Sequence, residues 1–473
     1  MPLTRARSLF AFACALAASS PVQAHAPARV MQFLSAKPED VVLATNRGII
    51  YGNLMTRDFK ILCNAAYGVS PAEETVRVAR TPSGRLLVAS SDGLQLSDDK
   101  GCTWQPAEGL DEVLTTAMAQ HPSDPTQIYF ATYSSGEAPH TASLRVTTDG
   151  GDTNSTLLSL GDEFLNGIAV APTTPAQIYM VGITLGPMAA AEFVARSVDG
   201  GKTWERHPVA LEMMERNAKL LAVNPVKPEE ILIRATGPEP SQAQRLLYSA
   251  DGGKTITSLG SVVGLDSAAF ARDGAVAYVA GLDGVQRVTG PSERKLEAPT
   301  SSARISQVFE LEGELLAAGY YQGIEAGKDG VGIGPTSSLS FEPWMAFTEV
   351  DEELKCSAEV EKKCKALWLD WQIENPPASG RPGASDGGTT VADAATILDA
   401  GTDAGLGRKD ASGDDDDEDE EQDEDEASAG GSAASSDGGC SCSTTSLTGS
   451  LREGGFWLLA LAFLSRRRRP SVH

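Results

Sequence analysis

The sequence has few of the residues that carry out most enzymatic chemistry. Its 473 residues include only five histidines, scattered along the chain, and aromatic residues make up only 6%. No G-x-S-x-G elbow, H-E-x-x-H helix or phosphate-binding P-loop occurs in it. The sequence therefore gives no indication of an enzyme, and we expect neither a cofactor nor a bound metal.

Long apolar runs are also missing, which bears on how the chain meets a membrane. The apolar stretch at 456–464 would form about 14 Å of helix, well short of a bilayer core about 30 Å thick. At the other end, Arg5 and Arg7 precede a short apolar run, and small residues follow it at 22–24. This order is typical of a secretory signal peptide, which we place at residues 1–24.

Cysteine is scarce, and its pattern favours disulfides. Of the seven cysteines, Cys14 belongs to the expected signal peptide. The even number that remains in an exported chain favours disulfide pairing. Zinc would require C-x-x-C pairs or nearby histidines, which the sequence does not have. The remaining cysteines are Cys63, Cys102, Cys356, Cys364, Cys440 and Cys442.

Basic residues are outnumbered, and the excess negative charge is concentrated in one segment. The net charge is −25, and residues 386–426 hold 17 Asp and Glu against Arg408 and Lys409. With almost no apolar residues, this segment cannot bury enough surface to offset the entropy of ordering. We expect a disordered acidic linker over residues 377–437. The negative balance also argues against nucleic acid as a partner.

The sequence does contain a repeated turn motif. The stretch SVDGGKTWE at 197 recurs as SDDKGCTWQ at 97, TTDGGDTNS at 147 and SADGGKTIT at 249, about fifty residues apart, which indicates a repeat architecture. Its glycines permit the positive φ angles of a tight turn, and its aspartate can accept hydrogen bonds from turn amides. The motif residues are Ser97, Asp99, Gly101, Trp104, Asp149, Ser197, Asp199, Gly201, Trp204, Ser249 and Asp251.

Apolar, β-rich segments around this motif recur seven times. Each unit fits four strands, A to D, in roughly forty to fifty residues, with the motif between strands C and D. Radial repetition of such units gives a propeller, whose closure protects the sheet edges. We therefore predict an all-β fold: a seven-bladed β-propeller over residues 25–348, followed by the acidic linker and a short C-terminal hydrophobic helix. Strands B are expected to start at 41, 86, 128, 178, 231, 276 and 315, and strands C at 48, 93, 143, 193, 245, 284 and 323, which leaves GVGIG at 330–334 as a β-turn.

The motif resembles the Asp-box, or BNR repeat, of sialidases, sortilin-type receptors and related propellers. The match is strong at 97 and 197 and partial at 147 and 249, where Asn154 and Ile256 replace the tryptophan. The resemblance implies that the aspartates serve the turn rather than catalysis. Sialidase activity would also need arginines, a Tyr/Glu pair and an acid elsewhere. Tyr320 and Tyr321, with Glu325 nearby, are the nearest match to that pair, but core or surface positions explain these tyrosines more simply.

The end of the chain resembles a second known pattern. GGCSCS at 438–443, the apolar run and the arginines at 466–469 follow the order of the MYXO-CTERM sorting tail of myxobacterial surface proteins. The resemblance implies export, processing near Cys440 or Cys442, and anchoring at the cell surface or outer membrane. Residues 438–473 would then be the sorting and anchor tail, and the only part that meets the membrane.

Loop lengths indicate a binding surface. The B–C loops of blades three, four and five, at 133–142, 183–192 and 236–244, are longer than those of the other blades and would form a rim on one face. Candidate binding residues on this rim are Tyr133, His140, Met188 and the glutamate of the Pro238–Glu239 pair.

The repeat register also predicts which cysteines pair. It places Cys63 on strand D of blade one and Cys102 in the C–D turn of blade two, both towards the outer rim of neighbouring blades. We therefore predict a Cys63–Cys102 disulfide, and a Cys356–Cys364 disulfide within an extension at 349–376.

Together these features predict a non-enzymatic binding or scaffold protein: a monomeric propeller displayed at the cell surface on an acidic stalk. The ligand is left open between a glycan, a peptide and an envelope protein. The alternatives are a sialidase-like glycan hydrolase and an envelope assembly factor, because a fold alone does not decide a function.

Overall fold

The computed structural model describes residues 28–376, with gaps at 70–76, 92, 112, 135–140, 186–189, 238–241, 291–292, 300–302 and 321–328. The chain divides into two units, and the described residues all belong to the first, which ends at Pro377. The predicted signal peptide, acidic linker, Cys440, Cys442 and sorting tail lie outside the described residues and stay predictions.

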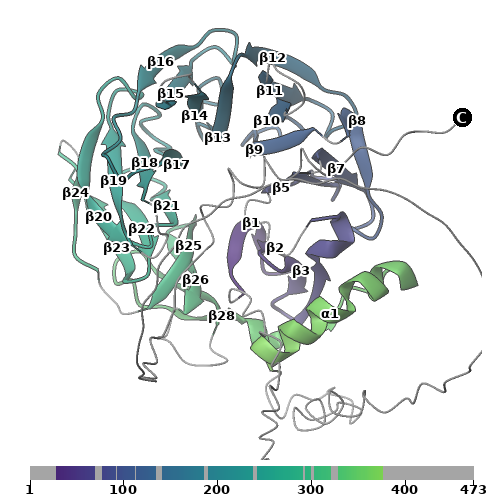
Figure 1. Cartoon of the computed structure of the whole chain (residues 1–473). Coiled ribbons are helices and arrows are strands. Elements are labelled where there is room, and N and C mark those ends of the chain that lie inside the picture. Colours follow the sequence, from purple (N-terminus) through teal and green to yellow (C-terminus); the bar gives the residue numbers. More distant parts are fainter. Residues whose placement is uncertain are drawn as a thin grey trace, which may run out of the picture. The chain divides into compact units, whose positions relative to one another are not determined.

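The strands of the first unit form the predicted seven-bladed β-propeller (Figure 1). In each blade four antiparallel strands pair in chain order, with strand A innermost and strand D outermost. Blade one contains β1 (Val30–Lys37), β2 (Asp40–Thr45), β3 (Gly48–Asn53) and β4 (Asp58–Cys63); blade two β5 (Arg77–Arg80), β6 (Leu86–Ser90), β7 (Gly93–Ser97) and β8 (Gln105–Asp111); blade three β9 (Leu114–Gln120), β10 (Ile128–Ser134), β11 (Thr141–Thr147) and β12 (Ser155–Leu160). Blade four contains β13 (Glu163–Val170), β14 (Ile178–Leu185), β15 (Ala190–Ser197) and β16 (Glu205–Pro208); blade five β17 (Asn217–Val223), β18 (Ile231–Thr236), β19 (Ala243–Ser249) and β20 (Thr257–Val263). Blade six contains β21 (Ser267–Phe270), β22 (Ala277–Gly281), β23 (Gly284–Thr289) and β24 (Lys295–Leu296); blade seven β25 (Arg304–Leu311), β26 (Glu314–Tyr320), β27 (Gly330–Pro335) and β28 (Glu342–Ala346).

The B strands have continuously apolar sequences because each blade packs against two neighbours. All five residues of β6 are buried. In β2, the consecutive residues Val42 and Leu43 are both 0% exposed, yet they belong to different apolar cores, one shared with blade two and the other with blade seven. A strand covered on both faces loses the alternation of a half-buried strand. Every predicted strand B overlaps an observed one.

The ring closes by a strand added from the C-terminal side. The 3₁₀ turn Phe347–Glu349 leads into β29 (Val350–Glu353), which pairs in parallel with β4 at the outer edge of blade one. Arg57, in the C–D turn of blade one, binds Glu349 Oε2 at 2.6 Å and donates to the Trp344 carbonyl at 2.9 Å. Blade seven is thus joined to blade one by main-chain pairing and by a partly buried ion pair.

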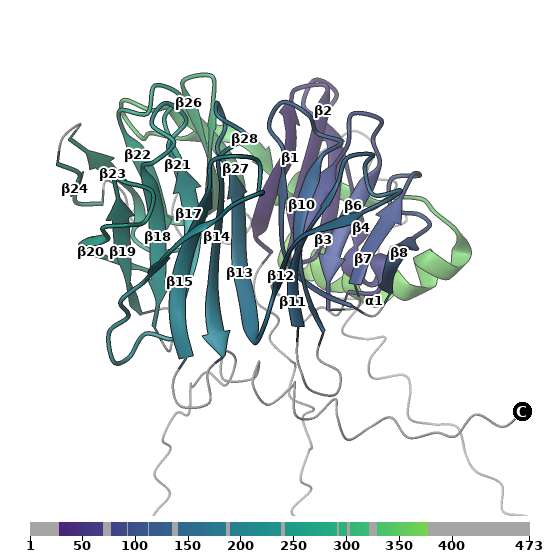
Figure 2. The ribbon, with the colours of Figure 1, turned by 90° about the horizontal axis from the view of Figure 1, so that it is seen from above.

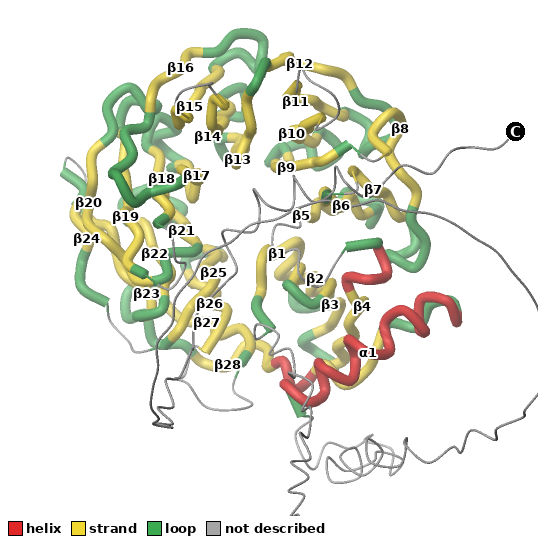
Figure 3. The backbone as a smooth tube through the Cα atoms, viewed as in Figure 1, coloured by secondary structure: helices red, strands yellow, loops and turns green. Residues whose placement is uncertain are grey.

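Helix α1 (Ala358–Glu374) packs on the outside of blade one, near the 3₁₀ turn η1 (Asn64–Tyr67) (Figure 3). Ser357 caps the helix by accepting from the Val360 amide, and acidic residues in the first turn suit the positive end of the helix dipole. The buried face carries Val360, Cys364 and Trp371. The Trp371 ring packs edge-on against Phe347, with centroids 5.4 Å apart.

The disulfide pairing differs from the prediction. Cys63 is bonded to Cys364 and Cys102 to Cys356, with Cα separations of 5.5 and 5.2 Å. The predicted Cys63–Cys102 and Cys356–Cys364 pairs are wrong because the C-terminal segment runs along the rim of blades one and two. Each propeller cysteine therefore meets a cysteine of that segment. The first turns of α1 also separate Cys356 from Cys364: helix rise from Ala358 alone is about 9 Å, more than a disulfide spans.

Strand C of blade seven is also displaced from its predicted place. GVGIG, expected as a turn, forms β27, and the predicted strand at 323–327 lies outside the described residues. Glycine made the segment look like a turn, but here glycine is needed because strand D lies so close. A Cβ at Gly330 would come 2.2 Å from the Met345 carbonyl oxygen, and one at Gly334 would come 2.1 Å from that of Ser340.

Each disulfide should stabilise the closed ring. The variants C63S/C364S and C102S/C356S are each expected to lower the free energy of unfolding by about 2–5 kcal/mol in denaturant titrations, because each bond closes a very long loop. Non-reducing peptide mapping of the wild type should recover the 63–364 and 102–356 pairs. Recovery of a peptide linking Cys63 to Cys102 would contradict the closure described here.

Candidate functional site

Turns and loops leave the propeller on two faces. Because the strands of a blade alternate in direction, the A–B and C–D turns lie at one end of the inner strands, and the B–C loops and D–A connections lie at the other (Figure 2). We call these ends the turn face and the loop face. The repeated motif therefore lies on the turn face, opposite the predicted binding rim.

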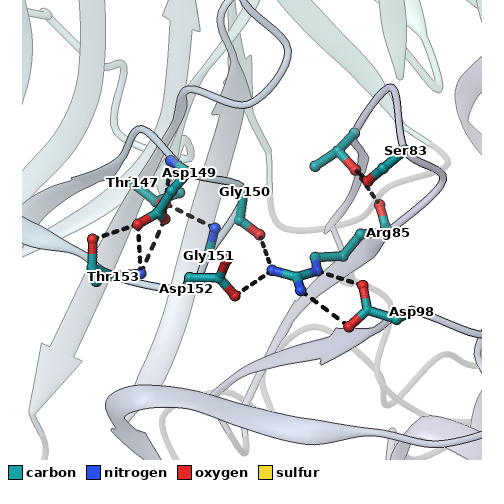
Figure 4. Close-up of polar contacts among 10 residues, drawn as sticks. Ser83, Arg85, Asp98, Thr147, Asp149, Gly150, Gly151, Asp152 and Thr153 are labelled. Atoms are coloured by element: carbon teal, nitrogen blue, oxygen red, sulfur yellow. Dashed lines mark hydrogen bonds and ion pairs between the residues drawn. The ribbon is translucent and has the colours of Figure 1, made fainter.

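The four repeated turns share one hydrogen-bond pattern. In blade three, the Thr147 hydroxyl donates to Asp149 at 2.7 Å and accepts from the Gly151 amide at 2.8 Å (Figure 4). Thr153 donates its amide and its hydroxyl to the same carboxylate at 3.0 and 2.6 Å. In the other three turns the serine hydroxyl likewise donates to the aspartate and accepts from the glycine amide, and the threonine amide donates to the aspartate. These residues are Ser97, Asp99, Gly101 and Thr103 in blade two, Ser197, Asp199, Gly201 and Thr203 in blade four, and Ser249, Asp251, Gly253 and Thr255 in blade five.

The residue after the motif threonine fastens the turn. Trp104 donates its indole N–H to the Gly101 carbonyl at 2.6 Å and packs against Tyr67 with ring centroids 5.4 Å apart. Asn154, which replaces the tryptophan in blade three, instead donates to the Glu108 carbonyl of blade two at 2.9 Å. In blade four, Trp204 donates to the Gly201 carbonyl at 3.0 Å.

Arg85 links the turns of two neighbouring blades. Its guanidinium lies 2.6 Å from Asp98 in blade two and 2.5 Å from Asp152 in blade three (Figure 4). The hydrogen bonds that Arg85 donates to these carboxylates raise its pKa. The charged groups seen here on the turn face are thus engaged in contacts within and between blades.

The motif aspartates stay ionised. Hydrogen bonds from the Thr203 side chain and amide lower the pKa of Asp199 to about 2. Burial would raise the pKa of Asp149, but hydrogen bonds from Thr153 and its other neighbours hold it at about 2 as well. A carboxyl group that has lost its proton at such low pH does not act as a general acid near neutrality. The geometry assigns these aspartates to the turns.

The predicted binding rim is described only in part. Tyr133 lies near the loop-face end of β10, partly buried, with its ring edge-on to Phe164 at 5.4 Å. His140, Met188 and the Pro238–Glu239 pair lie outside the described residues. Blade seven, expected to have a short B–C loop, has a long one. The B–C connections of blades three, four, five and seven cover 135–140, 186–189, 237–242 and 321–329, against 46–47, 91–92 and 282–283 in blades one, two and six.

A charged cluster at the propeller axis was missed by sequence reasoning. Arg29, just before β1, lies 3.6 Å from Asp266, just before β21, although blade seven stands between their blades. Arg234, in β18, reaches the same carboxylate at 3.4 Å and donates to the Leu265 carbonyl at 2.5 Å. We call Arg29, Arg77, Lys219, Arg234 and Asp266 the axial cluster; all lie towards the loop-face ends of their strands.

The axial cluster holds an excess of positive charge. Burial and the charges of Arg77 and Arg234 together lower the pKa of Lys219 to about 7, against the opposing effect of Asp266. Burial also lowers the pKa of Arg77. The Lys219 side chain makes no hydrogen bond or ion pair with any residue in the described part of the chain. Among the described residues, its ammonium group lies near three arginines and makes no ion pair with a carboxylate.

Only a weak sequence signal marks this cluster. Once the blades are aligned, strand A of blades one, two and seven begins at or just after an arginine, at Arg29, Arg77 and Arg304. No such pattern indicates Lys219 or Asp266, because these residues come close together only in the closed ring.

One buried carboxyl group has a strongly shifted pKa. Glu192, in β15, is 4% exposed, and burial raises its pKa to about 7. Neither carboxyl oxygen makes a hydrogen bond of normal geometry among the described residues, although the Ala218 amide of blade five lies near enough to oppose part of the shift. The group lies in the contact between blades four and five, out of reach of a substrate.

Comparisons with known proteins do not place this chain in a family. No protein-family model matches the sequence, and no curated protein matches it. The structure is similar to the GH74 enzyme of Niastella koreensis, at 16% identity over 65% of this chain and 51% of that one, with a TM-score of 0.42. It is also similar to the extracellular domain of the putative hybrid two component system BT4673 from B. thetaiotaomicron, at 12% identity over 65% of this chain and 38% of that one, with a TM-score of 0.43. A third similar structure is an oligogalacturonate lyase in complex with manganese, at 10% identity over 63% of this chain and 88% of that one, with a TM-score of 0.41. This chain therefore covers about half of the GH74 enzyme and less of the sensor domain.

Loss of a motif carboxylate should loosen its turn. D199A leaves turn amides unpaired, so we expect the midpoint of thermal unfolding at pH 7 to fall by about 2–8 °C. The folded pKa of about 2 lies below the unfolded value of 3.8, so the carboxylate stabilises the fold above pH 4 and loses this effect as the pH falls towards 2. The difference between wild type and D199A should therefore shrink at pH 2.5. K202A, in the same turn, is the control, and an equal effect of both variants at pH 7 would contradict this role.

Glu192 should make stability depend on pH in the opposite sense. Its folded pKa of about 7 exceeds the ordinary 4.5, so stability falls as the pH rises from 4.5 to 7. We expect E192Q to exceed the wild type by roughly 3 kcal/mol at pH 8, and by much less at pH 5, in urea titrations. The exposed substitution E293Q serves as the control. A difference between E192Q and wild type that stays constant from pH 5 to pH 8 would refute this assignment.

Proposed function

We propose that this protein is a non-enzymatic binding protein that presents its propeller at the cell surface, and that the loop face is the binding face. The axial cluster carries the proposal. Turn-face groups such as Asp149 and Arg85 are engaged in structural contacts, whereas at the loop-face end of the axis the Lys219 side chain has no partner among the described residues. Charged groups left without partners are the ones available to a ligand.

Surface display rests on the sequence. The signal peptide, the acidic linker and a tail that resembles MYXO-CTERM support export and anchoring, with the linker as a stalk. The two disulfides are in keeping with an oxidising compartment. Within the residues that the structure describes, no helix is long and apolar enough to span a membrane.

A sialidase-like glycan hydrolase is the second candidate, and an envelope assembly factor the third. A raised carboxyl pKa favours the hydrolase, since a general acid works best with a pKa near the operating pH. Glu192 has such a pKa, but it is 4% exposed between two blades. The motif aspartates, with pKa values as low as about 2, do not supply the acid either. Binding without hydrolysis is therefore the better supported function.

Two exposed apolar residues on opposite faces allow a matched test. Met213, in the D–A connection after blade four, is 96% exposed on the loop face, and Val226, in the A–B turn of blade five, is 56% exposed on the turn face. On a glycan array and against isolated cell envelopes, the exported protein should bind, M213E should weaken binding at least about fivefold, and V226E should leave it unchanged.

Two results would overturn the proposal. One is a larger loss of binding in V226E than in M213E, which would place the ligand on the turn face. The other is hydrolysis of a fluorogenic sialoside by the wild type above the level of a heat-denatured sample, which would favour the second candidate.

A further inference from the structure

The axial cluster, as defined by its residues, combines four cationic side chains with the single carboxylate of Asp266. Asp266 is shared by Arg29 at 3.6 Å and Arg234 at 3.4 Å, so its two oxygens are already engaged. Lys219 pairs across the sheet with Arg234 in strand register, which places two cationic side chains on adjacent strands of blade five. Among the described residues, nothing negative is left for the Lys219 ammonium.

The cluster is enclosed and still reached by solvent. The side chains of Arg29 and Asp266 are 31% and 32% exposed, and that of Arg234 is 14% exposed. Partial enclosure strengthens electrostatic attraction, because charges that are less hydrated interact more strongly. An anion entering from the loop face would thus meet charges from blades one, two and five at one place.

We propose that the axial cluster binds an oxyanion group, a carboxylate, sulfate or phosphate, between Lys219, Arg234 and the arginines of blades one and two. The inference rests on the proposed function, since it names the chemistry of the ligand for the loop face. Guanidinium groups present planar donor pairs that match oxyanions, and an ammonium adds a compact charge. The bound group is either a free anion or the acidic group of a larger ligand.

Binding is coupled to a proton. Within the described part of the chain, the charges that act on Lys219 are Arg234 on the paired strand, Arg77 and Arg29 from blades two and one, and Asp266 from blade six. On the other side of β17, the Ala218 amide faces Glu192. With its pKa lowered to about 7, Lys219 is largely neutral at pH 8 and largely charged at pH 6. An anion favours the charged form, so it binds more tightly at the lower pH.

Calorimetric titration with sulfate at constant ionic strength tests this inference. Sulfate keeps its charge between pH 6 and pH 8, so a change in affinity reports on the protein. The wild type should bind sulfate more tightly at pH 6 than at pH 8, by up to about tenfold for a group with a pKa near 7. K219M should weaken binding at pH 6 at least fivefold and abolish the pH dependence. K219R should bind with little pH dependence, because arginine stays charged.

The controls separate folding from binding and distinguish the ligand sources. K219M removes a poorly solvated cation, so its thermal midpoint should equal or exceed that of the wild type. K254M, at a half-exposed lysine on the turn face, should bind sulfate like the wild type. Parallel titrations with glucuronate and with inorganic phosphate show whether a carboxylate or a tetrahedral oxyanion is preferred, and binding of either supports the site.

Wild-type protein that binds none of the three anions at pH 6, or K219M that binds sulfate as tightly as the wild type, would overturn the inference. This failure differs from that of the proposed function. If M213E still loses binding to envelopes or glycans while K219M keeps it, the loop face binds its ligand without the axial cluster. If V226E is the variant that fails, the binding face itself is wrongly placed.

Discussion

The fold depends on every blade having a neighbour on each side. Val42 and Leu43, adjacent in one strand, are both fully buried only because blades two and seven cover opposite faces of β2. An open ring would leave the outer faces of blades one and seven exposed to water, and their apolar side chains would lose most of their stabilisation. Closure is therefore a condition for the core, and the seam between these blades is reinforced by β29, an ion pair and covalent bonds.

A second need, shared by all blades, is to satisfy the amides of the C–D turn, and different blades meet it differently. Blades two to five use the repeated aspartate. Blade one uses Asn53, whose side-chain oxygen accepts from the amides of Met55 and Thr56 at 2.8 and 3.1 Å. Asn53 and the motif aspartates thus meet the same requirement in different blades. Blade six has a different contact in this region, where Arg294 is buried against Glu230 of blade five at 2.5 Å.

Local sequence patterns predicted the fold well, but they did not predict contacts between residues that are far apart in the sequence. Runs such as LLVAS and the spacing of Asp99, Asp149, Asp199 and Asp251 are properties of single blades, so the sequence displays them directly. The prediction of strand C in blade seven was wrong for a local reason, because the glycines of β27 are required by the closeness of the neighbouring strand. The cysteine pairs and the axial cluster failed for another reason. Cys63 meets Cys364, and Arg29 meets Asp266, only after the ring has closed. For the candidate site, the sequence predicted binding at the loop face, but it did not predict the charged residues of the axial cluster.

The Cys63–Cys364 bond also determines how the molecule responds to pulling. Tension on the chain beyond residue 376 travels along α1 and reaches Cys364 before it reaches β29. The disulfide passes the pull to Cys63, the last residue of β4, whose strand is hydrogen-bonded to β3 on one side and β29 on the other. A second covalent path runs from Cys356 to Cys102 in blade two. The propeller is therefore held covalently at two adjacent blades.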